Sequence, residues 1–171
     1  MKIFFALLLL AFLSILFTGC NFLTKEQRWQ WAEFFGFHSG RPNPPTESDD
    51  ISSIIITDDI QKILYNGVYL RSRYHMHGTS YLRFYENGMV IEVNSTGNPE
   101  QIKRWFDIDC ENISKGNYER TDNSISFSCL IEEYGSVDYT GMIIENGLIL
   151  NVHSNINGWE GKNLIYEFYS W

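Results

Sequence analysis

The sequence predicts an all-β fold: an antiparallel meander of about eight strands that can close into a barrel, with one short inserted helix. Three observations favour it. From Gly67 onward, apolar and polar residues alternate with a period of two, as they do on strands. Short turn sequences, including Glu-Asn-Gly used twice, separate the alternating segments. Aromatic residues are abundant, with 12 Phe, 10 Tyr and 5 Trp, and suit a small barrel that needs large side chains to fill it. Closure into a barrel would also remove exposed strand edges.

The strands follow from the alternation and from the turns between them. Asn87-Gly88 supplies the positive φ that a tight hairpin turn requires, Asp122-Asn123 marks a second turn, and Glu145-Asn146-Gly147 marks a third. The expected strands are 68–74, 80–85, 89–94, 117–120, 124–131, 137–144, 148–153 and 165–169.

One helix is expected inside the domain, from about Pro99 to Phe106. Proline is tolerated in the first helical turn, and Glu100 suits the positive end of a helix. Farther upstream, Ile51 to Leu64 begins with a β-branched run and continues with Asp58-Asp59, which favours a short helix ending at Leu64.

The first twenty residues have the order of a secretion signal. Lys2 supplies a positive charge, Ile3 to Phe17 an apolar run, and Thr18-Gly19 two small residues before Cys20. This order resembles the lipobox signal peptide of bacterial lipoproteins. The resemblance implies a signal peptide over 1–19 and a Cys20 that carries lipid, including palmitate, as the first mature residue. The alternative, a membrane-spanning helix, needs roughly 20 apolar residues, and this run is shorter.

Among lipoproteins of this kind, a residue other than Asp after the cysteine favours the outer membrane. Asn21 therefore predicts a lipid-anchored protein of the bacterial cell envelope, at the outer membrane and facing the periplasm or the cell surface. Residues 24–37 are expected to form an aromatic helix that lies at the membrane interface or packs on the domain. The Pro- and acid-rich segment 38–50 is expected to be a flexible tether. The chain thus divides into 1–19 signal peptide, 20–50 anchor region and 51–171 β domain.

The charge argues against nucleic acid as a partner. All 21 acidic residues follow Cys20, whereas Lys2, one of 13 basic residues, lies in the leader, so the mature net charge is 12 minus 21, or minus 9. Binding to phosphates requires a strongly basic face instead.

Two cysteines remain once Cys20 is lipidated. In an oxidising compartment, Cys110 and Cys129 are expected to form a disulfide that closes a loop of about 20 residues, worth roughly 3 kcal/mol. Two buried free thiols, or a redox pair, are the alternatives.

A family resemblance rests on Gly67-Val-Tyr69, on Tyr81-Leu-Arg-Phe-Tyr-Glu-Asn-Gly88, on Lys115-Gly-Asn-Tyr118 and on Tyr166-Glu-Phe168. These motifs resemble small lipocalin-like domains, and a similar hairpin occurs in the lipocalin-like part of F-box protein 9 relatives. The resemblance covers about 105 residues of the chain. It implies a lipocalin-like barrel but not an activity. The Gly-x-Trp start of true lipocalins is absent, so their ligand residues are not carried over.

A set of arginines and tyrosines on two neighbouring strands is the candidate binding site for a ligand or partner. Because Val68, Leu70, Leu82 and Phe84 gain more from burial, we expect this set on the outer face of the barrel. It consists of Tyr69, Arg71, Arg73, Tyr81, Arg83 and Tyr85.

No pattern predicts catalysis, a cofactor or a metal. His75 and His77 lie two residues apart just beyond the end of the first strand, where two imidazoles could share a metal, but no third ligand is identifiable, and no nucleophile or phosphate-binding motif is found. Two functions remain: a non-catalytic module that binds a small apolar or amphipathic ligand in the barrel mouth, or a protein-interaction or structural envelope module with a filled barrel.

Overall fold

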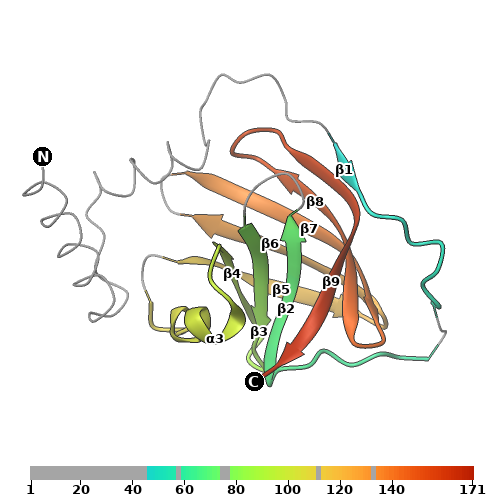
Figure 1. The fold of residues 1–171 in the computed structure, drawn as a ribbon, viewed down its shortest axis with the longest axis horizontal. Helices are drawn as coiled ribbons and strands as arrows, with labels where there is room; N and C mark the ends of the chain where they lie inside the picture. Colours follow the sequence, from blue (N-terminus) through green and yellow to red (C-terminus); the bar gives the residue numbers. More distant parts are fainter. Residues whose placement is uncertain (1–45, 57–58, 74–77, 111–112, 132–133) are drawn as a thin grey trace, which may run out of the picture.

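The computed structural model describes residues 46–56, 59–73, 78–110, 113–131 and 134–171. Within them, eight antiparallel strands form a closed barrel with one short helix on its outside (Figure 1). A ninth strand, β1 (Glu47–Ser48), joins this sheet in parallel with β9. The predicted fold class is confirmed. The barrel strands are β2 (Gly67–Arg73), β3 (Gly78–Phe84), β4 (Met89–Ser95), β5 (Ser114–Thr121), β6 (Ser124–Ile131), β7 (Gly135–Ile144), β8 (Gly147–Ser154) and β9 (Glu160–Ser170).

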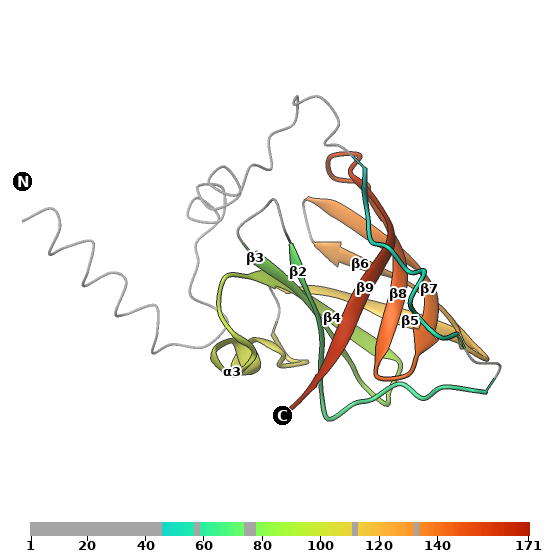
Figure 2. The ribbon, with the colours of Figure 1, turned by 45° about the vertical axis from the view of Figure 1, so that its right-hand side comes forward.

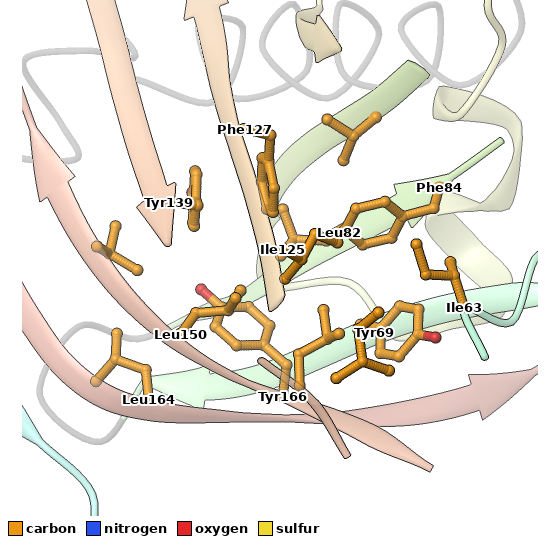
Figure 3. Close-up of a cluster of buried hydrophobic side chains, with 14 of the residues drawn as sticks. Ile63, Tyr69, Leu82, Phe84, Ile125, Phe127, Tyr139, Leu150, Leu164 and Tyr166 are labelled. Carbon is orange, nitrogen blue, oxygen red and sulfur yellow. The ribbon is translucent and has the colours of Figure 1, made fainter. Parts of the chain in front are cut away.

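The barrel closes because β9 pairs with β8 along most of its length and with β2 near its end. The interior is packed with an inner cluster of buried side chains, in which Phe127 stacks on Tyr139 and Phe84 contacts Tyr69 edge to face (Figure 3). The three largest fully buried side chains, Tyr69, Tyr139 and Tyr166, all belong to this cluster. Large aromatic rings therefore fill the barrel.

A second apolar layer lies outside the barrel wall. Helix α3 (Pro99–Ile102) and the 3₁₀ turn η1 (Lys103–Trp105) lie beside β2, β3 and β4 (Figures 1 and 2). Asn98 caps α3 through a reciprocal capping box with Gln101. Ile102 and Phe106 pack on the outer face of these strands, so this part of the sheet is buried on both faces. The resulting outer cluster comprises Val68, Tyr81, Ile91, Val93, Ile102 and Phe106.

One end of the barrel is closed by the segment that precedes β2. Ile63 enters the inner cluster at 5% exposure. The backbone N–H of Leu64 donates to the hydroxyl of Tyr69 at 2.8 Å, and the hydroxyls of Tyr65 and Tyr118 lie 3.0 Å apart. The strand connections place this segment at the end where the short β3–β4, β5–β6 and β7–β8 turns lie. We refer to it as the closed end.

Two expectations for the N-terminal part are wrong within the described residues. No helix forms over 59–64: this stretch has no regular secondary structure, Ile63 enters the inner cluster with Leu64 packed against it, and Ile60 is 65% exposed. The end of the expected tether, Glu47 and Ser48, pairs with β9 as strand β1. The expected helix at 24–37, the signal peptide and Cys20 lie outside the described residues.

The two Glu-Asn-Gly sequences form different turns. In the first, four residues connect β3 to β4, and Gly88 carries the positive φ of 88°. In the second, only two residues connect β7 to β8, and Asn146 carries the positive φ of 57°. The residue that needs the left-handed conformation depends on loop length and strand register, which the tripeptide does not encode.

Candidate functional site

The barrel has a seam between β2 and β9. These strands pair only from Gly67 opposite Ser170 to Leu70 opposite Glu167. Beyond Leu70 the early part of β9 pairs instead with β1, where Glu47 lies opposite Gly161 and Ser48 opposite Lys162. In Figure 1, β1 lies against the far end of β9, away from the C-terminus. The N-terminal segment therefore occupies the position that β2 leaves.

Arg71 holds this segment in the seam. Its guanidinium donates from Nη2 to Glu47 Oε1 at 2.7 Å and from Nε to Asp49 Oδ2 at 3.1 Å, and Nη2 also reaches Asp49 Oδ1. The same Asp49 Oδ2 accepts the backbone N–H of Ile165 at 2.9 Å. Only 6% of the Arg71 side chain is exposed, against 24% and 29% for its two partners. Asp49 thus forms hydrogen bonds to both strands of the seam, to β2 through Arg71 and to β9 through Ile165.

The electrostatics of the seam favour the charged forms of these groups. Burial acts to raise the pKa of Asp49, but the hydrogen bonds from Arg71 and Ile165 outweigh it, and the pKa lies below its ordinary value. Burial acts to lower the pKa of Arg71, but the hydrogen bonds to Asp49 and Glu47 raise it. A buried guanidinium without its carboxylates would lower the stability of the folded protein, because its charge would be uncompensated. The Arg71 cation therefore needs an acidic partner.

A cleft of about 480 Å³ opens at the seam. Apolar side chains of Leu70 and Ile165 line it together with the charged groups just described. The complete lining is Glu47, Ser48, Asp49, Leu70, Arg71, Ser72, Ile165 and Glu167. A second cleft, of about 340 Å³, lies on the outer side of β7, β8 and β9. There, His153 Nδ1 lies 3.5 Å from Glu160 Oε1, and both side chains are half exposed.

The barrel interior also contains a polar group that the sequence analysis missed. Glu92, on β4, is 4% exposed. Its carboxylate accepts hydrogen bonds from Asn94 Nδ2 at 3.0 Å and from Ser114 Oγ at 3.3 Å. Burial raises the pKa of Tyr139, and the charge of the neighbouring Glu92, which its hydroxyl contacts, raises it further. We call Glu92, Ser114 and Tyr139 the inner polar cluster.

The predicted site residues separate into two groups on opposite faces of the sheet. Tyr69 lies opposite Leu82, and Arg71 lies opposite the fully buried Ser80, so Tyr69 and Arg71 lie on the inner face. The expectation that they share the outer face with Tyr81 is wrong, because the register pairs Tyr69 with Leu82 and not with Tyr81. Arg73 ends β2, and its side chain lies outside the described residues.

Tyr81, Arg83 and Tyr85 do lie on the outer face, where they hold the helical layer. The hydroxyl of Tyr81 donates to the Gly97 carbonyl at 2.7 Å. The Phe106 carbonyl accepts from Tyr85 at 2.6 Å and from Arg83 at 3.3 Å. The Arg83 guanidinium lies between two aromatic rings, 4.9 Å from that of Tyr85 and 4.8 Å from that of Trp171. These contacts attach η1 to the barrel wall and leave little of the trio open to a partner.

The predicted Cys110–Cys129 disulfide is wrong. Cys129 is a free thiol, fully buried in the inner cluster on β6. Cys110 follows η1 and belongs to neither apolar cluster, whereas Cys129 lies in the inner cluster. Burial raises the pKa of the Cys129 thiol, and the charge of Glu92 raises it further. Such a thiol is not set up for nucleophilic or redox chemistry.

No group of three or more His, Cys, Asp and Glu residues in the described part of the chain is arranged to hold a metal ion. His75 and His77 lie outside that part. Among the described helices, none has the length and apolar character needed to span a bilayer.

The sequence contains a local signal for the acidic residues of the seam, but its alternation around Glu92 predicts the wrong environment for that residue. Glu47 and Asp49 alternate with Ser48 in the segment Thr46-Glu-Ser-Asp-Asp50, a two-residue spacing that puts both carboxylates on one side of an extended chain. Their Arg71 partner is not visible locally. Glu92 alternates with Ile91 and Val93, which predicts that the glutamate faces solvent; the outer helical layer reverses this arrangement.

Comparisons with protein-family models, with curated proteins and with solved structures each found no match to this chain.

Proposed function

We propose that this protein is a non-catalytic interaction module with a filled barrel, held at the bacterial envelope by lipid on Cys20. The observation that carries the proposal is the packing of the barrel interior. Every buried apolar member of the inner cluster is 6% exposed or less, from Leu82 at 0% to Phe127 at 6%. An interior ligand would require cavity surface on these side chains. The two clefts described above lie at the seam and on the outer side of the wall.

The anchor is part of the proposal and rests on the order of the first twenty residues. Acyl chains on Cys20 contribute about 0.8 kcal/mol per buried methylene, and two chains are enough for stable membrane residence. A module fixed at a membrane meets its partners within reach of a tether, so modest affinity is sufficient.

The second candidate is a barrel that binds a small amphipathic ligand near the end opposite Ile63. The barrel fold is compatible with such a module. The specific observation in its favour is Glu92, a carboxylate buried among apolar side chains, where a ligand with a hydrogen-bond donor would find a charged acceptor. Against it, both oxygens of Glu92 already accept hydrogen bonds, from Asn94 and from Ser114.

Native mass spectrometry of the full chain, purified from membranes in detergent, separates the two candidates. The filled barrel predicts only the mass of the lipidated polypeptide, with no further molecule released by denaturation and solvent extraction. A stoichiometric small molecule that appears only on denaturation would overturn the proposal and favour the second candidate. A control with Leu82→Ala, which opens space in the barrel, checks whether detergent alone can enter a cavity there.

A further inference from the structure

We propose that the seam is a binding site for an extended acidic segment of a partner protein, which adds to β9 in place of strand β1. This inference rests on the proposed function, since it names the kind of partner that the interaction module takes. In the structure, the chain's own residues Glu47 to Asp49 occupy the site. They show what the site recognises: a short parallel strand with a carboxylate at every second position.

The site has a backbone component. β9 offers its edge because the β2–β9 ladder stops at Leu70 and Glu167. Strand addition to such an edge gives affinity through main-chain hydrogen bonds, and alternate side chains give specificity. The observed occupant pairs over only two positions, Glu47 with Gly161 and Ser48 with Lys162, while Asp49 caps the N–H of Ile165. A longer segment would form more backbone pairs along the same edge and would displace this short strand.

The site also has a charge component. Arg71 is the cation of the seam, buried at 7% exposure and bonded to both carboxylates of the occupant. Alternation places Glu47 and Asp49 toward Arg71, while Ser48 between them is exposed. The motif that fits is therefore Glu-x-Asp or a close acidic equivalent. A neutral or basic segment would leave the guanidinium buried without a counter-charge.

The occupant we infer is another protein's segment. In the intact chain, Glu47–Ser48 competes from the same molecule at a high effective concentration, which keeps the site closed until a longer acidic strand displaces it. The cleft of about 480 Å³ beside Leu70 and Ile165 leaves room for side chains larger than those of the present occupant. The seam therefore acts as a site that the chain itself blocks.

The test uses the full chain in detergent and a fluorescent peptide that copies residues 44–52, with blocked ends. In the variant Glu47→Gln/Asp49→Asn, the internal strand loses both carboxylates, so the peptide should bind at least about tenfold more tightly than to the unaltered chain. Adding Arg71→Gln to this variant should remove that gain. A control peptide with Gln and Asn in place of its three acidic residues should not bind. Equal binding to all three proteins would overturn the proposal.

A second measurement covers the case in which the Arg71→Gln protein does not fold. The amide hydrogen of Ile165 should exchange faster in Glu47→Gln/Asp49→Asn than in the unaltered chain, and added acidic peptide should restore its protection. Exchange that the peptide leaves unchanged would contradict strand addition. If mixing the variant with unaltered chain yields a dimer by mass, the occupant is a second copy and the inference of another protein fails.

The failures of the two proposals are distinguishable. A ligand found inside the barrel, together with peptide binding at the seam, would remove the filled-barrel function and leave the seam site standing. A barrel that holds no ligand, together with an absence of peptide binding, would remove the seam site and leave the filled-barrel function standing.

Discussion

Tyr69 and Leu82 lie opposite each other across β2 and β3, and both side chains point into the barrel at 1% and 0% exposure. The Tyr69 hydroxyl reaches the closed end, where it accepts the backbone N–H of Leu64 at 2.8 Å. One side chain thus fills the core and also secures the segment that covers it.

Tyr69→Phe should therefore destabilise the protein by about 1–3 kcal/mol, because the Leu64 N–H is left without its acceptor in a partly buried place. Urea denaturation measures the loss, and the amide hydrogen of Leu64 should exchange faster. The matched control is Tyr169→Phe, since Tyr169 is 39% exposed and a surface change of this kind costs roughly 0.5 kcal/mol or less. Equal losses in both variants would contradict a role for Tyr69 in closing the barrel end.

Cys129 should be unreactive in the folded protein. Its thiol is fully buried and its pKa is raised by burial, so little thiolate forms near neutral pH. Iodoacetamide at pH 8, followed by mass spectrometry of the peptide that contains Cys129, should show modification only after denaturation. Modification of Cys129 in the native state, or recovery of Cys129 linked to Cys110, would contradict the assignment of Cys129 as a buried free thiol.

Asp49 should contribute stability that depends on pH. Its pKa in the folded protein lies below the ordinary value of 3.8, so the contribution is complete above that value and is lost as the pH falls through the lower, folded-state pKa. The difference in unfolding free energy between the unaltered chain and Asp49→Asn should be constant from pH 7 to about pH 5 and should shrink below about pH 4. Urea denaturation across this range measures it. A difference that grows on acidification would contradict the seam assignment.

Gly88→Ala should destabilise the β3–β4 hairpin through backbone strain alone. A Cβ at Gly88 meets no atom within 4 Å, but φ is 88°, which costs an L residue about 1 kcal/mol. Gly88→Asn should cost less than Gly88→Ala, because asparagine tolerates the left-handed region. Asn146→Gly, at the other turn, should change stability by roughly 0.5 kcal/mol or less. Thermal unfolding of the three variants tests this order.

Local patterns in the sequence identified most of the strands and their turns. Period-two alternation and turn residues depend on nearby chain, and strand β6 has the bounds expected from them, 124–131. The capped helix after Asn98 was likewise predicted from Pro99 and Glu100, although it continues as a 3₁₀ turn and not as a longer α-helix. Alternation shows that a strand has two faces, but it does not say which one faces the barrel.

The sequence by itself determined the all-β class and the order of the elements. Only the tertiary structure decided that Tyr69 and Arg71 lie on the inner face, that Glu92 is buried, and that Cys129 is a buried free thiol. It alone also brought Glu47 and Asp49 to Arg71 across the seam. The reason is that these outcomes depend on register and on an outer helical layer, both set by contacts between residues far apart in the chain, and a two-residue period carries no information about either.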